Sequence, residues 1–213
     1  MTPVPILLVA LLVSAGCYHY PAAPSVQAEN ETAVLVHGLS RTVLSMRPLA
    51  TRLADAGYDV HVIRYASTRK TITAHTDHLA QAVDDLNVPN GEPVHFVTHS
   101  LGGILVRNYL LRRPEGVRVG RTVMLAPPHE GSELADKYSR VPLADWICVP
   151  LDELRVHPDS TVRRMRSPAK HYEIGIIAGG KLDDEGHQDA IPGDDDGTVG
   201  VASTHLAGER DHL

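Results

Sequence analysis

The chain has 213 residues, which suits one domain, and its 43% hydrophobic and 22% charged residues are typical of a globular protein and argue against disorder. Lys and Arg total 20 against 26 Asp and Glu, a net charge of −6. Because the chain has no excess of basic residues to neutralise phosphates, non-specific electrostatic binding to nucleic acid is excluded. The 2 cysteines cannot form a disulfide framework or a four-thiolate zinc site, and the 13 scattered histidines show no HExxH-like spacing, which disfavours a metal enzyme.

The first 16 residues have the features of a targeting segment. Residues 4–15 (VPILLVALLVSA) form an apolar run that is too short to span a bilayer, which needs roughly 20 residues, and that fits the core of a secretory signal peptide. The following Ser14-Ala15-Gly16-Cys17 resembles a bacterial lipoprotein cleavage box. We therefore expect export, either with a lipid on Cys17 that anchors the protein in a membrane or after ordinary cleavage within 15–28, to the periplasm, the outer membrane or the medium.

Residues 17–30 are expected to form a tether, because Pro21–Asn30 combines Pro, Ala and polar residues without periodicity. The remaining 31–213 are expected to form the folded domain. If Cys17 carries a lipid, Cys148 is left as a lone thiol, expected to be buried and structural.

Strand and helix patterns alternate along the domain. Continuous apolar runs predict buried strands at 33–37, 60–65, 94–98, 122–126 and 174–178. Apolar residues three and four apart predict helices at 42–56 and 73–87, and further helices are expected at 101–113 and 130–139. This alternation indicates an α/β fold, with a mostly parallel sheet and helices on both faces.

The segment 127–168 interrupts this alternation. It contains six prolines and the only tryptophan, Trp146. A long insertion after a central strand is a usual place for a small lid or cap over a site. A plain connecting helix with loops is the alternative reading.

Ser100 is the candidate nucleophile. It follows the predicted strand 94–98 in His99-Ser100-Leu101-Gly102-Gly103, directly before a helix. This context is that of a nucleophile elbow, a tight turn that raises a serine hydroxyl above the sheet. Thr98 stands where the usual GxSxG pattern has glycine, so we expect a slightly more open turn. Ser100 as a simple helix N-cap is the alternative.

Backbone amides near this turn could stabilise an oxyanion. His37-Gly38 follows the first predicted strand, and the turn there could direct the Leu39 N–H into the site. The Leu101 N–H lies at a helix start, where the dipole favours negative charge. Together Leu39 and Leu101 could form an oxyanion hole.

A serine nucleophile needs a base and a carboxylate that orients the base. The loop after strand 174–178 offers Asp194, Asp195 and Asp196, and we select Asp196, which precedes Gly197. For Asp194 and Asp195 we expect solvated loop charges, with a calcium site as the lesser alternative.

Four motifs together resemble the α/β-hydrolase superfamily, and most closely small bacterial triacylglycerol lipases and esterases. They are His-Gly-Leu at 37–39, His-Ser-Leu-Gly-Gly at 99–103, Ala-Pro-Pro-His-Glu-Gly-Ser at 126–132 and Asp-Gly-Thr-Val at 196–199. The resemblance covers about 33–213. It implies a serine esterase or lipase that needs no cofactor and no metal, with an ester or lipid substrate, Ser100 as nucleophile, Asp196 as acid, and Leu39 and Leu101 as oxyanion donors.

The resemblance also implies a catalytic histidine on a loop after the last strand, but only 17 residues follow Asp196. Either the base is missing and the last strand is absent, or His212 serves as the base after the C-terminus folds back. A missing base would favour a catalytically impaired, hydrolase-like lipoprotein that binds acyl groups. An acyltransferase on the same fold is a third reading, and the acyl chain, the alcohol part and the oligomeric state are not readable from the residues.

Overall fold

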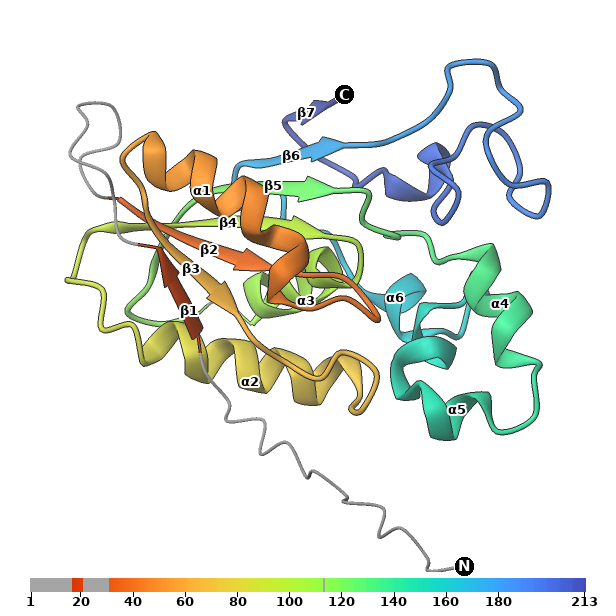
Figure 1. Ribbon diagram of the computed structural model, residues 1–213, viewed down its shortest axis with the longest axis horizontal. Helices are drawn as coiled ribbons and strands as arrows, with labels where there is room; N and C mark the ends of the chain where they lie inside the picture. Colours follow the sequence, from red (N-terminus) through yellow and green to blue (C-terminus); the bar gives the residue numbers. More distant parts are fainter. Residues whose placement is uncertain (1–16, 21–30, 113) are drawn as a thin grey trace, which may run out of the picture.

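The protein is described by a computed structural model that covers residues 17–20, 31–112 and 114–213. It is built on a seven-stranded sheet in the order β1-β3-β2-β4-β5-β6-β7 (Figure 1). The edge strand β1 is antiparallel to β3, and every other neighbouring pair is parallel. The strands are β1 (Cys17–Tyr20), β2 (Thr32–Val36), β3 (Asp59–Ile63), β4 (Pro93–His99), β5 (Arg118–Leu125), β6 (Ile174–Ile177) and β7 (Asp211–His212).

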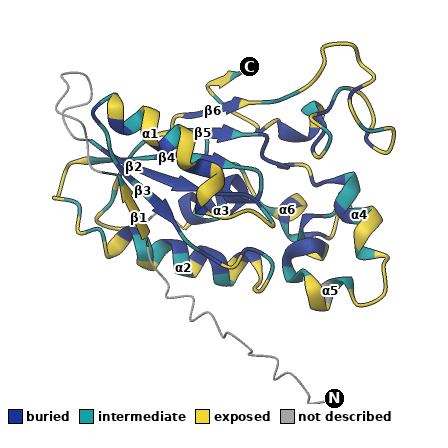
Figure 2. Cartoon of the chain, viewed as in Figure 1, coloured by how far each residue is buried: buried dark blue, intermediate teal, exposed yellow. Residues whose placement is uncertain are grey.

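Helices cover both faces of the sheet, as the sequence predicts. On one face lie η1 (Val43–Met46) and α1 (Arg47–Asp55), and on the other lie α2 (Ile72–Asp84) and α3 (Leu101–Leu111) (Figure 1). In β2, Ala33 and Leu35 pack towards α1, while Val34 and Val36 pack towards α2 and α3. Because successive side chains of a strand point to opposite faces, a strand buried on both sides must be apolar throughout. Figure 2 shows this burial along the central strands.

The five predicted strands and four predicted helices are all present, with ends that shift by a few residues. The segment 17–30 differs from the expected tether, because Cys17–Tyr20 form β1 and pair with β3. Residues 21–30 and the predicted signal peptide 1–16 lie outside the described residues. No helix in the described part of the chain is long and apolar enough to cross a membrane.

The insertion between β5 and β6 folds into short helices that lie beside the carboxyl edge of the sheet (Figure 1). They are α4 (Glu133–Ser139), α5 (Ala144–Ile147), η2 (Val149–Leu154) and α6 (Thr161–Arg164). We call α4, α5, η2 and α6 the cap. Leu151, Leu154 and Val162 are buried in the main core cluster, so the cap packs against the domain.

A short last strand is present, although its absence is one of the two alternatives drawn from the sequence. After η3 (Val201–Thr204), β7 pairs in parallel with β6 through Gly175 with Asp211 and Ile176 with His212. Two further bonds extend this pairing, from the Leu213 N–H to the Ile176 carbonyl and from the Ala178 N–H to the Leu213 carbonyl. A two-residue strand carries too little periodicity to be predicted from sequence.

Candidate active site

Ser100 lies on a sharp turn between β4 and α3. Its backbone angles are φ 51° and ψ −121°, a conformation that L-residues rarely adopt and that costs about 1–3 kcal/mol. The Ser100 N–H donates to the Leu125 carbonyl, which ties the turn to β5. No side-chain capping bond is formed by Ser100, so the N-cap alternative does not explain the residue. The geometry is that of the predicted elbow.

Two glycines allow the elbow to form. A Cβ on Gly102 would lie 2.4 Å from the Val36 carbonyl oxygen, and a Cβ on Gly38 would lie 2.7 Å from His99 Nδ1. Helix α3 can therefore start against the end of β2 only with glycine at 102. Thr98, at the first position of the elbow, is fully buried, and its Oγ1 would lie 3.3 Å from a Cβ on Gly103.

The loop that carries Leu39 is held by His37. The buried His37 ring stacks on Tyr65 with centroids 4.3 Å apart, and the Tyr65 hydroxyl donates to the His37 carbonyl at 2.6 Å. Burial lowers the pKa of His37, so the ring stays neutral and acts as packing. These contacts hold the chain before Gly38, and the bond from the Arg41 N–H to the Gly38 carbonyl closes the turn that carries Leu39.

Ser100 and Leu39 open into one cavity with a volume of about 480 Å³ at the carboxyl edge of the sheet. The wall opposite Ser100 comes from the cap and is largely apolar, being formed by Leu134, Ala135, Tyr138, Cys148, Leu151 and Leu154. Such a mix, with few polar groups in an apolar pocket, is typical of small-molecule sites. Leu101 is fully buried behind Ser100, with its N–H in the first turn of α3, where helical N–H groups lack partners within the helix.

Asp196 lines the same cavity, whereas Asp194 and Asp195 do not. Its Oδ1 accepts hydrogen bonds from the Thr198 and Val199 N–H groups at 2.9 and 2.8 Å. Neither hydrogen bond uses Oδ2. A carboxylate held in this way by the backbone has one oxygen left to orient an imidazole.

Asp194 and Asp195 organise the loop instead. Asp195 is fully buried and accepts from the N–H groups of His187, Gln188 and Gly197. Asp194 likewise accepts three backbone bonds, from residues 181, 182 and 195. The expectation of solvated charges is thus wrong for Asp195, because backbone amides replace its water.

A family model described as the alpha/beta hydrolase family matches residues 33–197. The chain belongs to this family. The match spans the elbow, the loop of Leu39 and Asp196, so the geometry described above is that of an α/β hydrolase. A search of curated proteins found no significant match.

Solved structures of a lipase, a carboxyl esterase and a phospholipase share the fold. The mature lipase BlEst2 of Bacillus licheniformis superposes with a TM-score of 0.70 at 19% identity, over 92% of this chain and 87% of that one. A metagenomic carboxyl esterase gives 0.67 at 20% identity, over 91% and 65%. The Legionella pneumophila phospholipase PlaB gives 0.61 at 20% identity, over 82% and 45%.

His212 does not reach this hydrolase cavity. It lies on β7, stacks on His205 with centroids 3.8 Å apart, and places Nε2 2.8 Å from Thr204 Oγ1. Strand β7 is three positions from β4 in the sheet, a separation of about 14 Å at the usual strand spacing. The structure therefore brings Ser100, Asp196 and Leu39 together around one cavity and leaves His212 outside it.

His99 is the histidine that lines the cavity. Its pKa is lowered by burial and by the positive charge of Arg41, and Asp196 opposes this shift. Among the described residues, no hydrogen bond joins a histidine to the Ser100 hydroxyl or to Asp196. A Cβ on Gly38 would lie 2.7 Å from His99 Nδ1, so the His99 ring packs against the loop that carries Leu39.

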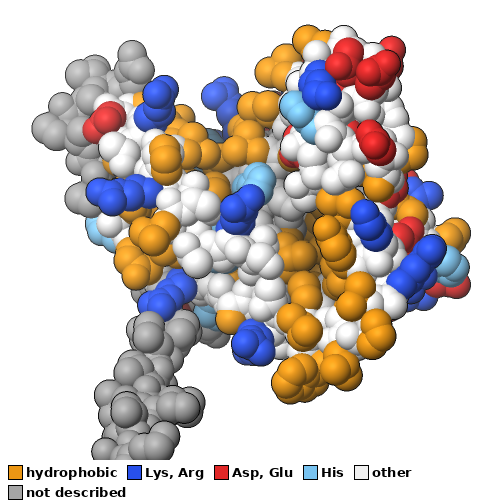
Figure 3. All heavy atoms as spheres, turned by 45° about the vertical axis from the view of Figure 1, so that its right-hand side comes forward, with side chains coloured by type: hydrophobic (Ala, Val, Ile, Leu, Met, Phe, Trp, Pro, Cys, Tyr) orange, Lys and Arg blue, Asp and Glu red, His pale blue; other side chains and the backbone are white. Residues whose placement is uncertain are grey.

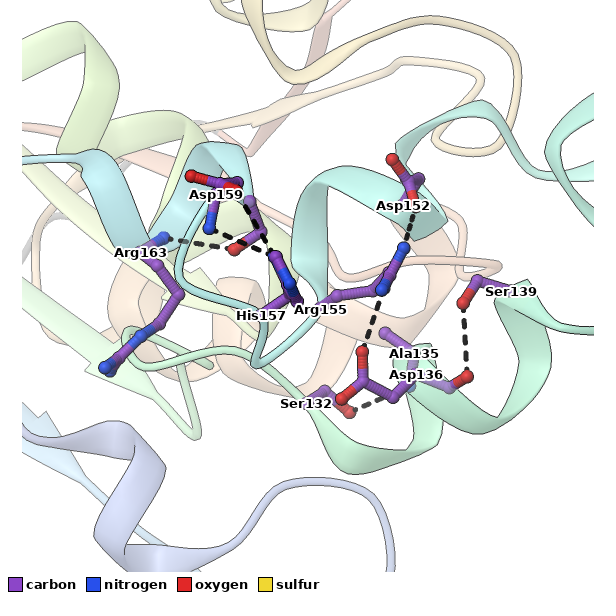
Figure 4. A network of polar contacts seen from close by, with 10 residues as sticks. Ser132, Ala135, Asp136, Ser139, Asp152, Arg155, His157, Asp159 and Arg163 are labelled. Carbon is purple, nitrogen blue, oxygen red and sulfur yellow. Dashed lines mark hydrogen bonds and ion pairs between the residues drawn. The ribbon is translucent and has the colours of Figure 1, made fainter.

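The cap is held in place by Arg155, which the sequence analysis does not single out. Its guanidinium donates to Asp136 of α4 at 3.0 Å and to Asp152 of η2 at 2.7 Å (Figure 4). The Ser132 hydroxyl accepts from the Ala135 N–H and caps α4 in the same view. These bonds join two cap elements that both line the cavity, so Arg155 positions its apolar wall.

Proposed function

We propose that the chain is a carboxylic ester hydrolase that forms an acyl-enzyme on Ser100. The observation that carries this proposal is the strained Ser100 turn, which opens with Asp196 and Leu39 into one cavity walled by apolar cap residues. A non-Gly residue is kept at such angles only when the surrounding structure enforces it, and such residues cluster at active sites.

In the proposed reaction, the Ser100 oxygen attacks the ester carbonyl carbon. The negative charge that develops on the carbonyl oxygen is stabilised by the N–H groups of Leu39 and Leu101, each by a few kcal/mol. An imidazole accepts the Ser100 hydroxyl proton and gives it to the alcohol as the ester C–O bond breaks. Water then attacks the acyl carbonyl, a water proton passes through the imidazole to the Ser100 oxygen, and the acyl group leaves as the acid. The free oxygen of Asp196 orients the imidazole that transfers these protons.

The assignment of the proton acceptor is tested by histidine variants. His99 lines the cavity, whereas His212 must leave its contacts with Thr204 and His205 to act. Matched variants H99A and H212A, assayed with a soluble ester, distinguish them. The variant that removes the base should lose roughly 10³-fold or more in kcat. The kcat of the other variant should stay within a few-fold of the wild-type value.

The apolar cap supports a lipid-like acyl group as substrate. On the segment that runs from α4 through α5, large hydrophobic side chains are exposed, among them Leu143 at 73% and Trp146 at 80%. Figure 3, in which this side comes forward, shows exposed hydrophobic side chains gathered on this face. A patch of this kind beside a pocket fits contact with aggregated lipid.

The proposal is tested with a fluorophosphonate probe at neutral pH. We expect labelling of the folded chain at Ser100, no labelling of S100A, and turnover of p-nitrophenyl esters that S100A lacks. A folded chain that neither reacts with the probe nor cleaves esters of any acyl length would overturn it.

A second candidate is an acyl-binding protein without turnover. It is favoured by the absence, among the described residues, of a histidine bonded to Ser100 or Asp196. It predicts that a fluorescent fatty acid binds the wild type and S100A equally while the probe fails to label either. Competition between the probe and the fatty acid would instead support the hydrolase.

We also propose that the chain is exported and carries a lipid on Cys17. Support comes from the sequence pattern of residues 4–17 and from the exposure of Cys17 at the start of β1. Metabolic labelling with an alkyne palmitate analogue in a bacterial host should mark the wild type and not C17A. Secreted, unlabelled wild type would instead identify an ordinary signal peptide.

A further inference from the structure

Three side chains of metal-ligand type converge at the edge of the sheet formed by β1 and β3. The strand register places His19 directly opposite His61. Asp59 lies two residues before His61 on β3, so both side chains point to the same face of the sheet. The same face carries α2, because Ile63, two residues further along, packs in the α2 and α3 core cluster.

The three side chains are already in contact. His19 Nε2 lies 2.5 Å from Asp59 Oδ1, and His61 Nε2 lies 3.0 Å from Asp59 Oδ2. The two imidazole rings stack with centroids 4.6 Å apart and 15° between their planes. One nitrogen from each histidine and one carboxylate oxygen all lie within 4.8 Å of one another.

We propose that His19, Asp59 and His61 bind a divalent transition-metal ion, of which Zn²⁺ is the best match. Zinc prefers imidazole nitrogen and carboxylate oxygen at about 2.0–2.2 Å, which places neighbouring ligand atoms about 3.3 Å apart. The two nitrogen-to-oxygen separations, 2.5 and 3.0 Å, are shorter than this value, so small side-chain rotations that move the ligand atoms apart suffice. The partial exposure of all three residues leaves a fourth position for water.

Binding also needs a change of tautomer in the two histidines. In the present contacts, Nε2 of each imidazole carries the hydrogen that it donates to Asp59. When zinc takes the Nε2 lone pair, the hydrogen of each ring resides on Nδ1, which is the form in which histidine binds metals. The charge of the carboxylate then offsets part of the charge of the ion.

The site would attach β1 to the sheet and takes no part in ester chemistry. None of the three residues lines the cavity of Ser100. Strand β1 has only four residues and pairs with β3 alone, so its ladder is short. A metal bound between residues 19 and 61 would join the N-terminal strand to the core of the domain.

A second cluster offers an internal comparison. His205, Glu209 and His212 also bring three ligand atoms within 4.8 Å. There, however, Glu209 accepts a bond from the Leu206 N–H and His212 is bonded to Thr204, so both are engaged by groups outside the cluster. We therefore place the zinc at the first cluster and use the second as the control.

The test measures zinc binding by the full chain without a histidine tag, by competition with a fluorescent chelator. We expect one zinc per chain. H19A and H61A should each weaken zinc binding at least about tenfold. Loss of a group that is only hydrogen-bonded to a metal ligand already lowers metal affinity by about that factor, and loss of a ligand should cost more. H205A should bind like the wild type, and Mg²⁺ should not compete, since it requires oxygen ligands.

Two further readouts keep the test independent of folding. H19A removes a half-exposed side chain and should give the same circular dichroism spectrum as the wild type. Zinc should slow amide exchange of residues 17–20 in the wild type and not in H19A. Equal zinc affinity of wild type, H19A and H61A, or loss of zinc in H205A alone, would overturn the proposal.

Discussion

The carboxylates of Asp195 and Asp196 belong to adjacent residues and have opposite environments. Asp195 is fully buried and accepts three backbone N–H groups, while Asp196 is exposed and lines the cavity with Ser100. The loop is therefore built so that one carboxylate holds its shape and the next is presented to the site. Substitution of each residue should separate stability from activity.

For the first prediction we compare D195N with D196N. In D195N an NH₂ group, which is a donor, replaces an oxygen that accepts from backbone N–H groups. The free energy of unfolding, measured in urea, should therefore fall by about 2–3 kcal/mol. D196N keeps the oxygen that accepts from residues 198 and 199, so its stability should change by less than about 0.5 kcal/mol. Its kcat for a soluble ester should fall by about 10⁴. Full activity in a folded D196N would count against its role.

The close approach of Gly102 to β2 leads to the second prediction. A methyl group there meets the Val36 carbonyl oxygen, and backbone cannot move aside as a flexible side chain can. G102A should destabilise the domain by about 2 kcal/mol or more and abolish fluorophosphonate labelling of Ser100. The control is G175A on β6, where nothing lies within 4 Å of the added atom, and its labelling should be unchanged.

Exposed Trp146 on the cap is the subject of the third prediction. If the cap contacts lipid aggregates, W146A should raise the half-saturating concentration of an emulsified ester by roughly 5–30-fold, since burying a large side chain contributes about 1–2 kcal/mol. The rate with a soluble short ester should change less than about twofold. L44A removes a side chain that is 68% exposed outside the cavity lining and should leave both assays unchanged.

Acid sensitivity is the fourth prediction. Burial and nearby Lys70 lower the pKa of His75 to about 4 from its ordinary 6.5. Below pH 6.5 the unfolded chain binds a proton at His75 that the folded chain does not, so stability is complete above pH 6.5 and falls as pH drops towards 4. The loss from this residue should be on the order of 2 kcal/mol.

Urea unfolding between pH 7.5 and 4.5 measures this effect, with H75Q as the comparison. Gln does not titrate, so H75Q should show a smaller decline over the same range. A decline of the same size in both proteins would show that other groups cause it. Burial also lowers the pKa of His37, His99, His129 and His212, so these residues should contribute to the decline that remains in H75Q.

Features encoded locally could be predicted from the sequence. The strand at 94–98 carries an apolar run and the helix is expected directly after Ser100, so the elbow could be placed between them. The two-sided burial of β2 follows in the same way from its unbroken apolar run. These parts depend on residues that are close together in the chain.

Features formed by distant residues could not be predicted. Strand β1 forms because Cys17–Tyr20 pair with the edge of β3, some forty residues later in the chain. A short polar strand of this kind gives no periodic signal in the sequence. The cluster of His19 with Asp59 and His61 depends on the same pairing. The burial of Asp195 likewise arises only in the folded loop, whereas Asp196 could be selected as the acid from its place before Gly197.

The antiparallel direction of β1 has a consequence for how the protein would sit on a bilayer. Cys17 pairs with Ile63, the last residue of β3, so it lies at the carboxyl edge of the sheet, where the Ser100 pocket also opens. An acyl anchor on Cys17 would therefore leave the domain from the side that holds the pocket mouth. Such a tethered molecule would face its own membrane, and lipids of that membrane would be the substrates within reach.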